Sequence, residues 1–124
     1  MFEKIMVVED DADFRMLLVD ELLKGHYEIV QAEDGEQAID KFNKHKPRLI
    51  LLDLLLPKMD GFTVLEKLKE ITSIVQTPII IYTNFDKPEY AKKAKEFNIE
   101  DYYLKSQTQI NTVCQRVKEL LEAK

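Results

Sequence analysis

The chain has 124 residues, the size of one domain built around a single hydrophobic core. Hydrophobic residues make up 45% of it and charged residues 33%, a globular composition that excludes intrinsic disorder. Lys and Arg total 18 against 23 Asp and Glu, and the resulting net charge of −5 disfavours binding to nucleic acid or to an anionic membrane surface.

The number of cysteines and the lengths of the apolar runs indicate the cellular compartment in which the protein functions. The single cysteine, Cys114, cannot form an internal disulfide, which suits a reducing compartment such as the cytoplasm. No apolar run approaches the roughly 18 residues of a membrane span, and the N-terminal one is too short for a signal peptide. We therefore expect one cytoplasmic domain over residues 1–124, without a membrane partner.

Five short segments rich in Ile, Val, Leu and Tyr predict β-strands. They are residues 5–8, 29–30, 49–52, 79–82 and 102–104. Longer segments of helical periodicity separate them, and this alternation is typical of a parallel sheet covered by helices. The third and fourth runs are continuously apolar, which favours central positions in the sheet. The sequence therefore predicts an α/β domain of the (βα)₅ type.

Helix boundaries can be predicted at several points between these strands. The first helix has Asp11 as its expected N-cap and Gly25 just past its end. Its predicted apolar face consists of Phe14, Leu17, Leu18 and Leu22. A capping box from Asp86 to Glu89 is expected to open the fourth helix, and Asn98, which tolerates left-handed backbone, is expected to close it.

Polar residues follow four of the five predicted strands. Residues 9–11 are acidic, and Asp53, Thr83 and Lys105 come directly after the third, fourth and fifth strands. Because the carboxyl ends of parallel strands lie along one edge of a sheet, we expect these side chains to converge there. A ligand site at this edge is therefore predicted.

Asp53 is the least ordinary of these residues. It interrupts the apolar run 49–56, where a buried charge costs several kcal/mol unless it is compensated. Glu9, Asp10 and Asp53 would repel one another, so the group needs a cation. An all-oxygen set suits Mg²⁺, or Mn²⁺, better than zinc, and Lys105 supplies a further positive charge.

A carboxylate beside a divalent ion, a lysine and a hydroxyl is equipped for phosphoryl transfer. The sequence lacks the residues that other common catalytic and binding sites require. The positions of His26 and His45 offer neither a His-based triad nor, with one cysteine, a zinc site. The chain also has no Gly-rich dinucleotide motif and no Walker loop.

Several motifs together resemble the receiver domain of two-component response regulators. They are the acidic pair after VV, the segment LLDLLLPKMDG around Asp53, Thr83 after IIIY, and Tyr102 three residues before Lys105. The resemblance covers essentially the whole chain. It implies a flavodoxin-like, doubly wound parallel sheet of five strands in the order 2-1-3-4-5.

The resemblance also implies a role for each residue at the site. Asp53 would accept a phosphoryl group from the phosphohistidine of a histidine kinase or phosphotransfer protein. Lys105 would pair with the phosphoryl oxygens, and Thr83 would donate a hydrogen bond to one of them. Such a domain catalyses its own phosphorylation and dephosphorylation and is not a metabolic enzyme.

Metal binding and switching are implied in the same way. Asp10, Asp53 and the backbone carbonyl of Leu55 would bind Mg²⁺, with Glu9 holding metal-bound water. When Thr83 is drawn toward the phosphoryl group, Tyr102 would turn inward, and the face formed by the fourth helix, fifth strand and fifth helix would change shape for a downstream protein.

The sequence departs from the family pattern at two positions. Ser106 follows Lys105 where the family usually has proline, so we expect a trans peptide bond there and Ser106 capping the last helix. Asn84 stands where a small residue is usual, and its side chain is expected to narrow access to Asp53.

Other functions have less support in the sequence. A haloacid-dehalogenase phosphatase needs an acid where Leu55 stands, and a flavodoxin needs a neutral phosphate loop where residues 9–11 are acidic. The remaining alternative is a degenerate receiver that binds proteins without phosphorylation. We expect no output domain in this chain, because only about one helix's length follows Lys105.

Overall fold

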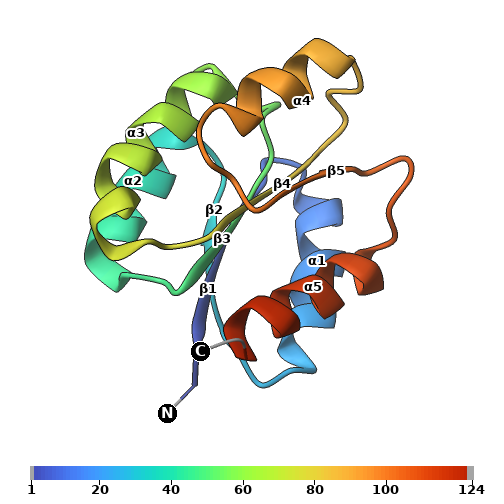
Figure 1. Cartoon of the computed structure of the whole chain (residues 1–124). Helices are drawn as coiled ribbons and strands as arrows, with labels where there is room; N and C mark the ends of the chain where they lie inside the picture. The colour runs from blue at the N-terminus through green and yellow to red at the C-terminus, as the bar shows by residue number, and fades with distance from the viewer. Residues whose placement is uncertain (1, 123–124) are drawn as a thin grey trace.

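The computed structural model describes residues 2–122, apart from the side chains of residues 72–75. Five strands alternate with five helices along the chain (Figure 1). The strands are β1 (Lys4–Val8), β2 (Glu28–Ala32), β3 (Leu49–Leu52), β4 (Ile79–Thr83) and β5 (Asp101–Leu104). The helices are α1 (Ala12–Leu23), α2 (Gly35–His45), α3 (Gly61–Val75), α4 (Pro88–Lys95) and α5 (Ile110–Glu122).

All strand pairings in the sheet are parallel, in the order β2-β1-β3-β4-β5. Helices α1 and α5 cover one face, and α2, α3 and α4 cover the other (Figure 1). The predicted α/β class, the five strands and their order are thus confirmed. The carboxyl ends of all five strands lie along the same edge.

Alternate residues of each strand enter two separate cores. In β1, Met6 and Val8 face the core beneath α2, α3 and α4, while Ile5 and Val7 face the core beneath α1 and α5. Every residue of β3 and β4 is buried. Because both faces of these strands are covered, they read as continuous apolar runs, and their predicted central positions are confirmed.

Asp11 and Asn98 lie at the predicted start of α1 and the predicted end of α4, and Gly25 lies just past the end of α1 as predicted. The Asp11 side chain caps α1 by accepting hydrogen bonds from the backbone N–H groups of Asp13 and Phe14, at 3.0 and 3.2 Å. Asn98 adopts left-handed backbone after α4, with φ of 58°. Past the end of α1 the left-handed residue is His26, with φ of 64°, and not Gly25.

Leu17 was expected on the buried face of α1, but it is 60% exposed. The stripe that packs on the sheet and on α5 consists of Leu18, Val19 and Leu22, which turns Leu17 toward solvent. Apolar spacing alone did not distinguish these two stripes, because Met16 and Leu17 are also apolar.

Two predicted caps are wrong. Pro88 is at the start of α4, which makes Lys87 the N-cap, without a side-chain capping bond, and leaves Asp86 outside the helix. Ser106 does not cap α5, which begins at Ile110, because residues 105–108 form a turn closed by hydrogen bonds to the Leu104 carbonyl. The described chain has no cis peptide bond, so the expected trans bond before Ser106 is confirmed.

Over residues 2–122, no helix combines the length and the apolar character needed to cross a bilayer.

Candidate functional site

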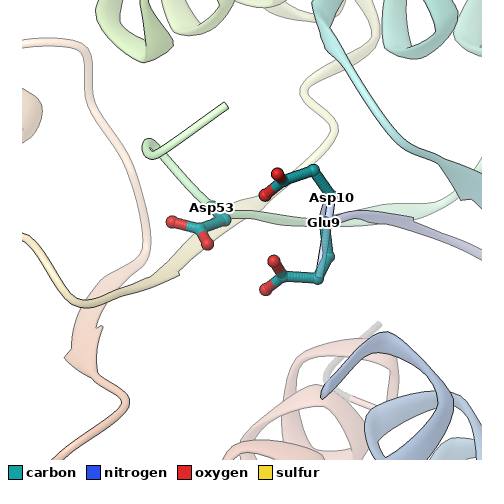
Figure 2. Close-up of side chains that lie close together, drawn as sticks. All are labelled: Glu9, Asp10 and Asp53. Carbon is teal, nitrogen blue, oxygen red and sulfur yellow. The ribbon is translucent and has the colours of Figure 1, made fainter. Parts of the chain in front are cut away.

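Three carboxylates meet at the carboxyl edge of the sheet. Glu9 and Asp10 follow β1, and Asp53 follows β3. One carboxylate oxygen from each lies within 4.8 Å of the others. Figure 2 shows how the side chains of Glu9 and Asp10 extend from neighbouring positions near Asp53. Glu9 and Asp53 are buried, whereas Asp10 is exposed, so the group is open to solvent on one side.

The sheet ladder continues past the formal strand ends and fixes these positions. The N–H of Asp53 donates to the Val8 carbonyl at 3.0 Å, and the N–H of Glu9 donates to the Ala32 carbonyl at 2.9 Å. The backbone of Glu9 and Asp53 is therefore held by the sheet. Expected convergence at one edge is confirmed for Glu9, Asp10 and Asp53.

Thr83, at the end of β4, is fully buried, and its hydroxyl donates to Asp53 Oδ1 at 2.6 Å. The N–H of Leu55 donates to the same oxygen at 3.0 Å. These two hydrogen bonds orient the Asp53 carboxylate. They also place the backbone of Leu55 beside the site.

Lys105 is the cation at the centre of the site. Its Nζ lies 2.5 Å from Glu9 Oε1 and 2.8 Å from Asp53 Oδ2. The ammonium also lies 4.3 Å from the ring centroid of Phe14, a cation–π contact. The N–H of Lys105 donates to the Thr83 carbonyl at 2.8 Å, which fixes the start of its side chain against β4.

The ion pairs leave the site with more negative than positive charge. Burial raises the pKa of Glu9 to about 7, although its hydrogen bond to Lys105 lowers it, and the Asp53 charge raises it further. Burial lowers the pKa of the Lys105 ammonium, but its hydrogen bonds to Asp53 and Glu9 outweigh this, and the net change is upward. Lys105 is therefore charged, but this single ammonium does not neutralise a group of three carboxylates.

The donor set fits a small divalent cation. All three groups are oxygen donors, they lie close together, and Asp10 offers an exposed carboxylate that forms no ion pair within residues 2–122. Hard cations such as Mg²⁺ and Mn²⁺ prefer such ligands and retain water on an open side. The residues present therefore fit the predicted metal.

Tyr102 and Asn84 are the remaining residues that the sequence assigned to the site. Tyr102 is half-buried in β5, and its hydroxyl donates to the Phe85 carbonyl at 2.8 Å. Burial raises the pKa of this hydroxyl to about 12, so it remains a donor at neutral pH. Asn84 directly follows Thr83 and is exposed.

Sequence reasoning missed Arg15, whose side chain is hydrogen-bonded to the backbone of the acidic loop after β1. Its Nη1 donates to the Glu9 carbonyl at 2.6 Å, and its Nε donates to Gln31 Oε1 at 3.0 Å. The guanidinium thus fixes the peptide between Glu9 and Asp10 against β2. One signal was available, because Arg15 is the sole basic residue between positions 9 and 23.

Comparisons with known proteins agree on one family. A sequence model of the response regulator receiver domain matches residues 5–118. The chain is 34% identical over 106 residues to chemotaxis protein CheY of Bacillus subtilis, covering 85% of this chain and 87% of CheY. It is 33% identical over 124 residues to sporulation initiation phosphotransferase F of the same organism, covering 100% and 98%.

Solved structures agree with the sequence relatives. The BeF3-activated receiver domain of Klebsiella pneumoniae RstA superimposes with a TM-score of 0.85 at 30% identity, covering 97% of this chain and 99% of that one. Curated transcriptional regulators also match, but the chain spans only 39% to 49% of their length.

The raised pKa of Glu9 predicts an unusual pH dependence of stability. Because the pKa rises from 4.5 to about 7 on folding, the stability that Glu9 contributes is fully present below pH 4.5 and is lost as the pH rises through 7. Relative to Glu9→Gln, the metal-free protein should lose up to about 1.4 kcal/mol per pH unit in this window, the limit for one proton.

The measurement is urea unfolding in a metal chelator at several pH values between 4.5 and 7.5. Glu36→Gln, which neutralises an exposed glutamate on α2, is the matched control and should retain the wild-type slope. A Glu9→Gln protein with that same slope would contradict the assignment.

Proposed function

Since this chain belongs to the receiver domain family of response regulators, we propose that Asp53 accepts a phosphoryl group from the phosphohistidine of a histidine kinase or phosphotransfer protein. The observation that carries the proposal is the environment of Asp53. It is a buried carboxylate at a strand end, with one oxygen bonded to Thr83 and the other to Lys105. Both partners are positioned to contact a group transferred to Asp53.

In the proposed reaction an oxygen of Asp53 attacks phosphorus. The new O–P bond forms as the P–N bond breaks, and the imidazole leaves with the bonding electron pair, neutral because its other nitrogen carries a proton. Lys105, 2.8 Å from Asp53 Oδ2, is positioned to neutralise charge on the transferred group. Thr83 is positioned to donate its hydroxyl to a phosphoryl oxygen once Asp53 no longer accepts it.

We assign the metal ligands as Asp10, Asp53 and the backbone carbonyl of Leu55, with Glu9 holding metal-bound water. When bound, Mg²⁺, or Mn²⁺ in its place, would neutralise negative charge on the phosphoryl oxygens. The close carboxylate oxygens and the position of the Leu55 backbone support this assignment.

The proposed output follows from Thr83 and Tyr102. Movement of the Thr83 hydroxyl toward a phosphoryl group would release space into which Tyr102 turns, and the α4-β5-α5 face would change shape for a downstream protein. In support, Tyr102 is half-buried, and its hydroxyl is held by the loop after β4. Within the described residues, nothing supports the alternative of a receiver that binds proteins without phosphorylation.

Absence of nucleic-acid binding through this domain, absence of membrane binding and a cytoplasmic location stay predictions. They rest on the net charge of −5 and the single cysteine.

Phosphorylation can be tested with a small donor. Incubation with acetyl phosphate and Mg²⁺ should add the mass of one phosphoryl group to the intact wild-type protein, and Asp53→Asn should gain none. Asp60→Asn is the matched control, because Asp60 is an exposed aspartate whose hydrogen bond to the Thr63 N–H asparagine can replace. An adduct that persists in Asp53→Asn, or that is lost in Asp60→Asn, would refute Asp53 as the acceptor.

Asn84 is proposed to narrow the approach to Asp53. If its effect is steric, Asn84→Ala should accelerate autophosphorylation and autodephosphorylation together, by up to about tenfold, because both need an in-line approach past this side chain. Acceleration of hydrolysis alone would indicate instead that Asn84 donates a hydrogen bond to the phosphoryl oxygens. Asn43→Ala, at an exposed position on α2, is the control, and unchanged rates in Asn84→Ala would rule out both roles.

A further inference from the structure

We propose that Phe85 carries the phosphorylation state of Asp53 to helices α3 and α4, so that the α3-α4 side of the domain responds as well as the face around Tyr102. The inference rests on the proposed function, because it takes Asp53 as the group that changes. It concerns a residue in the loop after β4 whose backbone is hydrogen-bonded to Thr83 and to Tyr102.

The backbone of Phe85 is two hydrogen bonds away from Asp53. The Thr83 hydroxyl donates to Asp53 Oδ1 at 2.6 Å, and the same Thr83 oxygen accepts from the Phe85 N–H at 3.3 Å. If the hydroxyl turns to a phosphoryl oxygen, the acceptor of the Phe85 N–H moves with it. The first link of the route is therefore a shared oxygen atom.

The carbonyl of Phe85 faces the other way. It accepts the hydroxyl of Tyr102 at 2.8 Å, so Phe85 is held between β4 and β5 by its two backbone groups. If the Phe85 N–H follows the Thr83 oxygen, either the hydrogen bond from Tyr102 breaks or Phe85 is displaced as a whole. In both cases the Phe85 side chain changes its position.

The ring of Phe85 joins two helices. It stacks on Tyr90 of α4, with centroids 4.5 Å apart and an interplanar angle of 26°. It also lies near parallel to Phe62 of α3, at 6.3 Å and 16°, and Phe62 and Tyr90 are themselves 6.1 Å apart. We call these three rings the aromatic bridge. Phe62 is only 7% exposed, and Phe85 and Tyr90 are partly buried against the same core, so movement of the Phe85 ring would change its packing against these neighbours.

The two helices differ in how firmly they are held. A Cβ on Gly61, the first residue of α3, would lie 2.0 Å from the Leu54 carbonyl oxygen, so this turn is pressed against the loop after Asp53. Helix α4 is eight residues long and buries only Ala94, and its N-cap residue, Lys87, forms no side-chain capping hydrogen bond. The weaker attachment is that of α4, which is therefore the helix that shifts.

The contact between the exposed Lys93 and Phe62 depends on the relative position of α3 and α4. Lys93 of α4 places its Nζ 4.4 Å from the ring centroid of Phe62 on α3. A displacement of α4 would move this ammonium off the ring and present both groups differently to solvent. The α3-α4 side would thus change its surface without any contribution from α5.

Two substitutions separate this route from the one through Tyr102. Phe85→Leu removes the aromatic stack but retains the backbone N–H, the carbonyl and an apolar side chain. Tyr102→Phe removes the hydroxyl that holds the carbonyl but leaves the aromatic bridge complete. Phe97→Leu is the matched control, because Phe97 is also partly buried against the same core but lies outside the bridge.

The experiment records amide NMR spectra of each protein before and after addition of Mg²⁺ and acetyl phosphate, with intact mass measured on the same sample. In wild type and Phe97→Leu, signals of α4 and of the first turn of α3 should shift on phosphorylation. In Phe85→Leu these shifts should fall to less than about half, while the phosphorylated fraction and the shifts beside Asp53 persist. In Tyr102→Phe the α3 shifts should remain and those of β5 should decrease.

The possible failures are distinguishable. If the mass of wild type does not increase, both the proposed function and the role of Phe85 are overturned. If phosphorylation occurs but Phe85→Leu retains the wild-type shifts in α3 and α4, or Phe97→Leu loses them equally, only the role of Phe85 is overturned. Tyr90→Leu breaks the bridge from the α4 side and should reproduce the effect of Phe85→Leu if the stack is the route.

Discussion

The interaction on which the site depends is the contact of one buried ammonium with two buried carboxylates. Lys105 lies between Glu9 and Asp53, and it thereby connects the ends of β1, β3 and β5 across 96 and 52 positions of sequence. An unpaired carboxylate at either position would cost several kcal/mol in this environment. Asp10 adds a third carboxylate, so one ammonium does not neutralise the group, and this excess of negative charge favours binding of a cation.

In this fold the strands hold the backbone of the site in place, and the loops after the strands carry the groups that are proposed to move. Strands β3 and β4 are buried on both faces and fix the backbone of Asp53 and Thr83, while the loops that follow carry the groups able to move. Thr83 belongs to both parts, because its backbone is in β4 and its hydroxyl is shared between Asp53 and Phe85. A change at Asp53 can therefore reach the surface through the loop after β4 without disturbing the sheet.

Much of this arrangement could be predicted from sequence, since buried parallel strands require continuous Ile, Val and Leu runs, and their ends must lie at one edge. Asp53 was identifiable because a charge inside such a run needs compensation. The exposure of Leu17 could not be predicted from the sequence, because it depends on how α1 packs against its neighbours. The late start of α5 could not be predicted because it depends on a local turn. The aromatic bridge could not be predicted from the sequence either, because Phe62, Phe85 and Tyr90 are brought together only by the relative placement of two helices and a loop.

The claim that the site lacks one cation is tested most directly by unfolding the protein with and without Mg²⁺. Wild type should gain about 2.7 kcal/mol at a Mg²⁺ concentration one hundred times its Kd. Asp10→Asn, which removes an uncompensated charge and breaks no ion pair within residues 2–122, should be more stable than wild type in chelator and should gain little from Mg²⁺. Asp13→Asn, an exposed aspartate in the first turn of α1, should respond like wild type. Equal stabilisation of wild type and Asp10→Asn by Mg²⁺ would contradict the account.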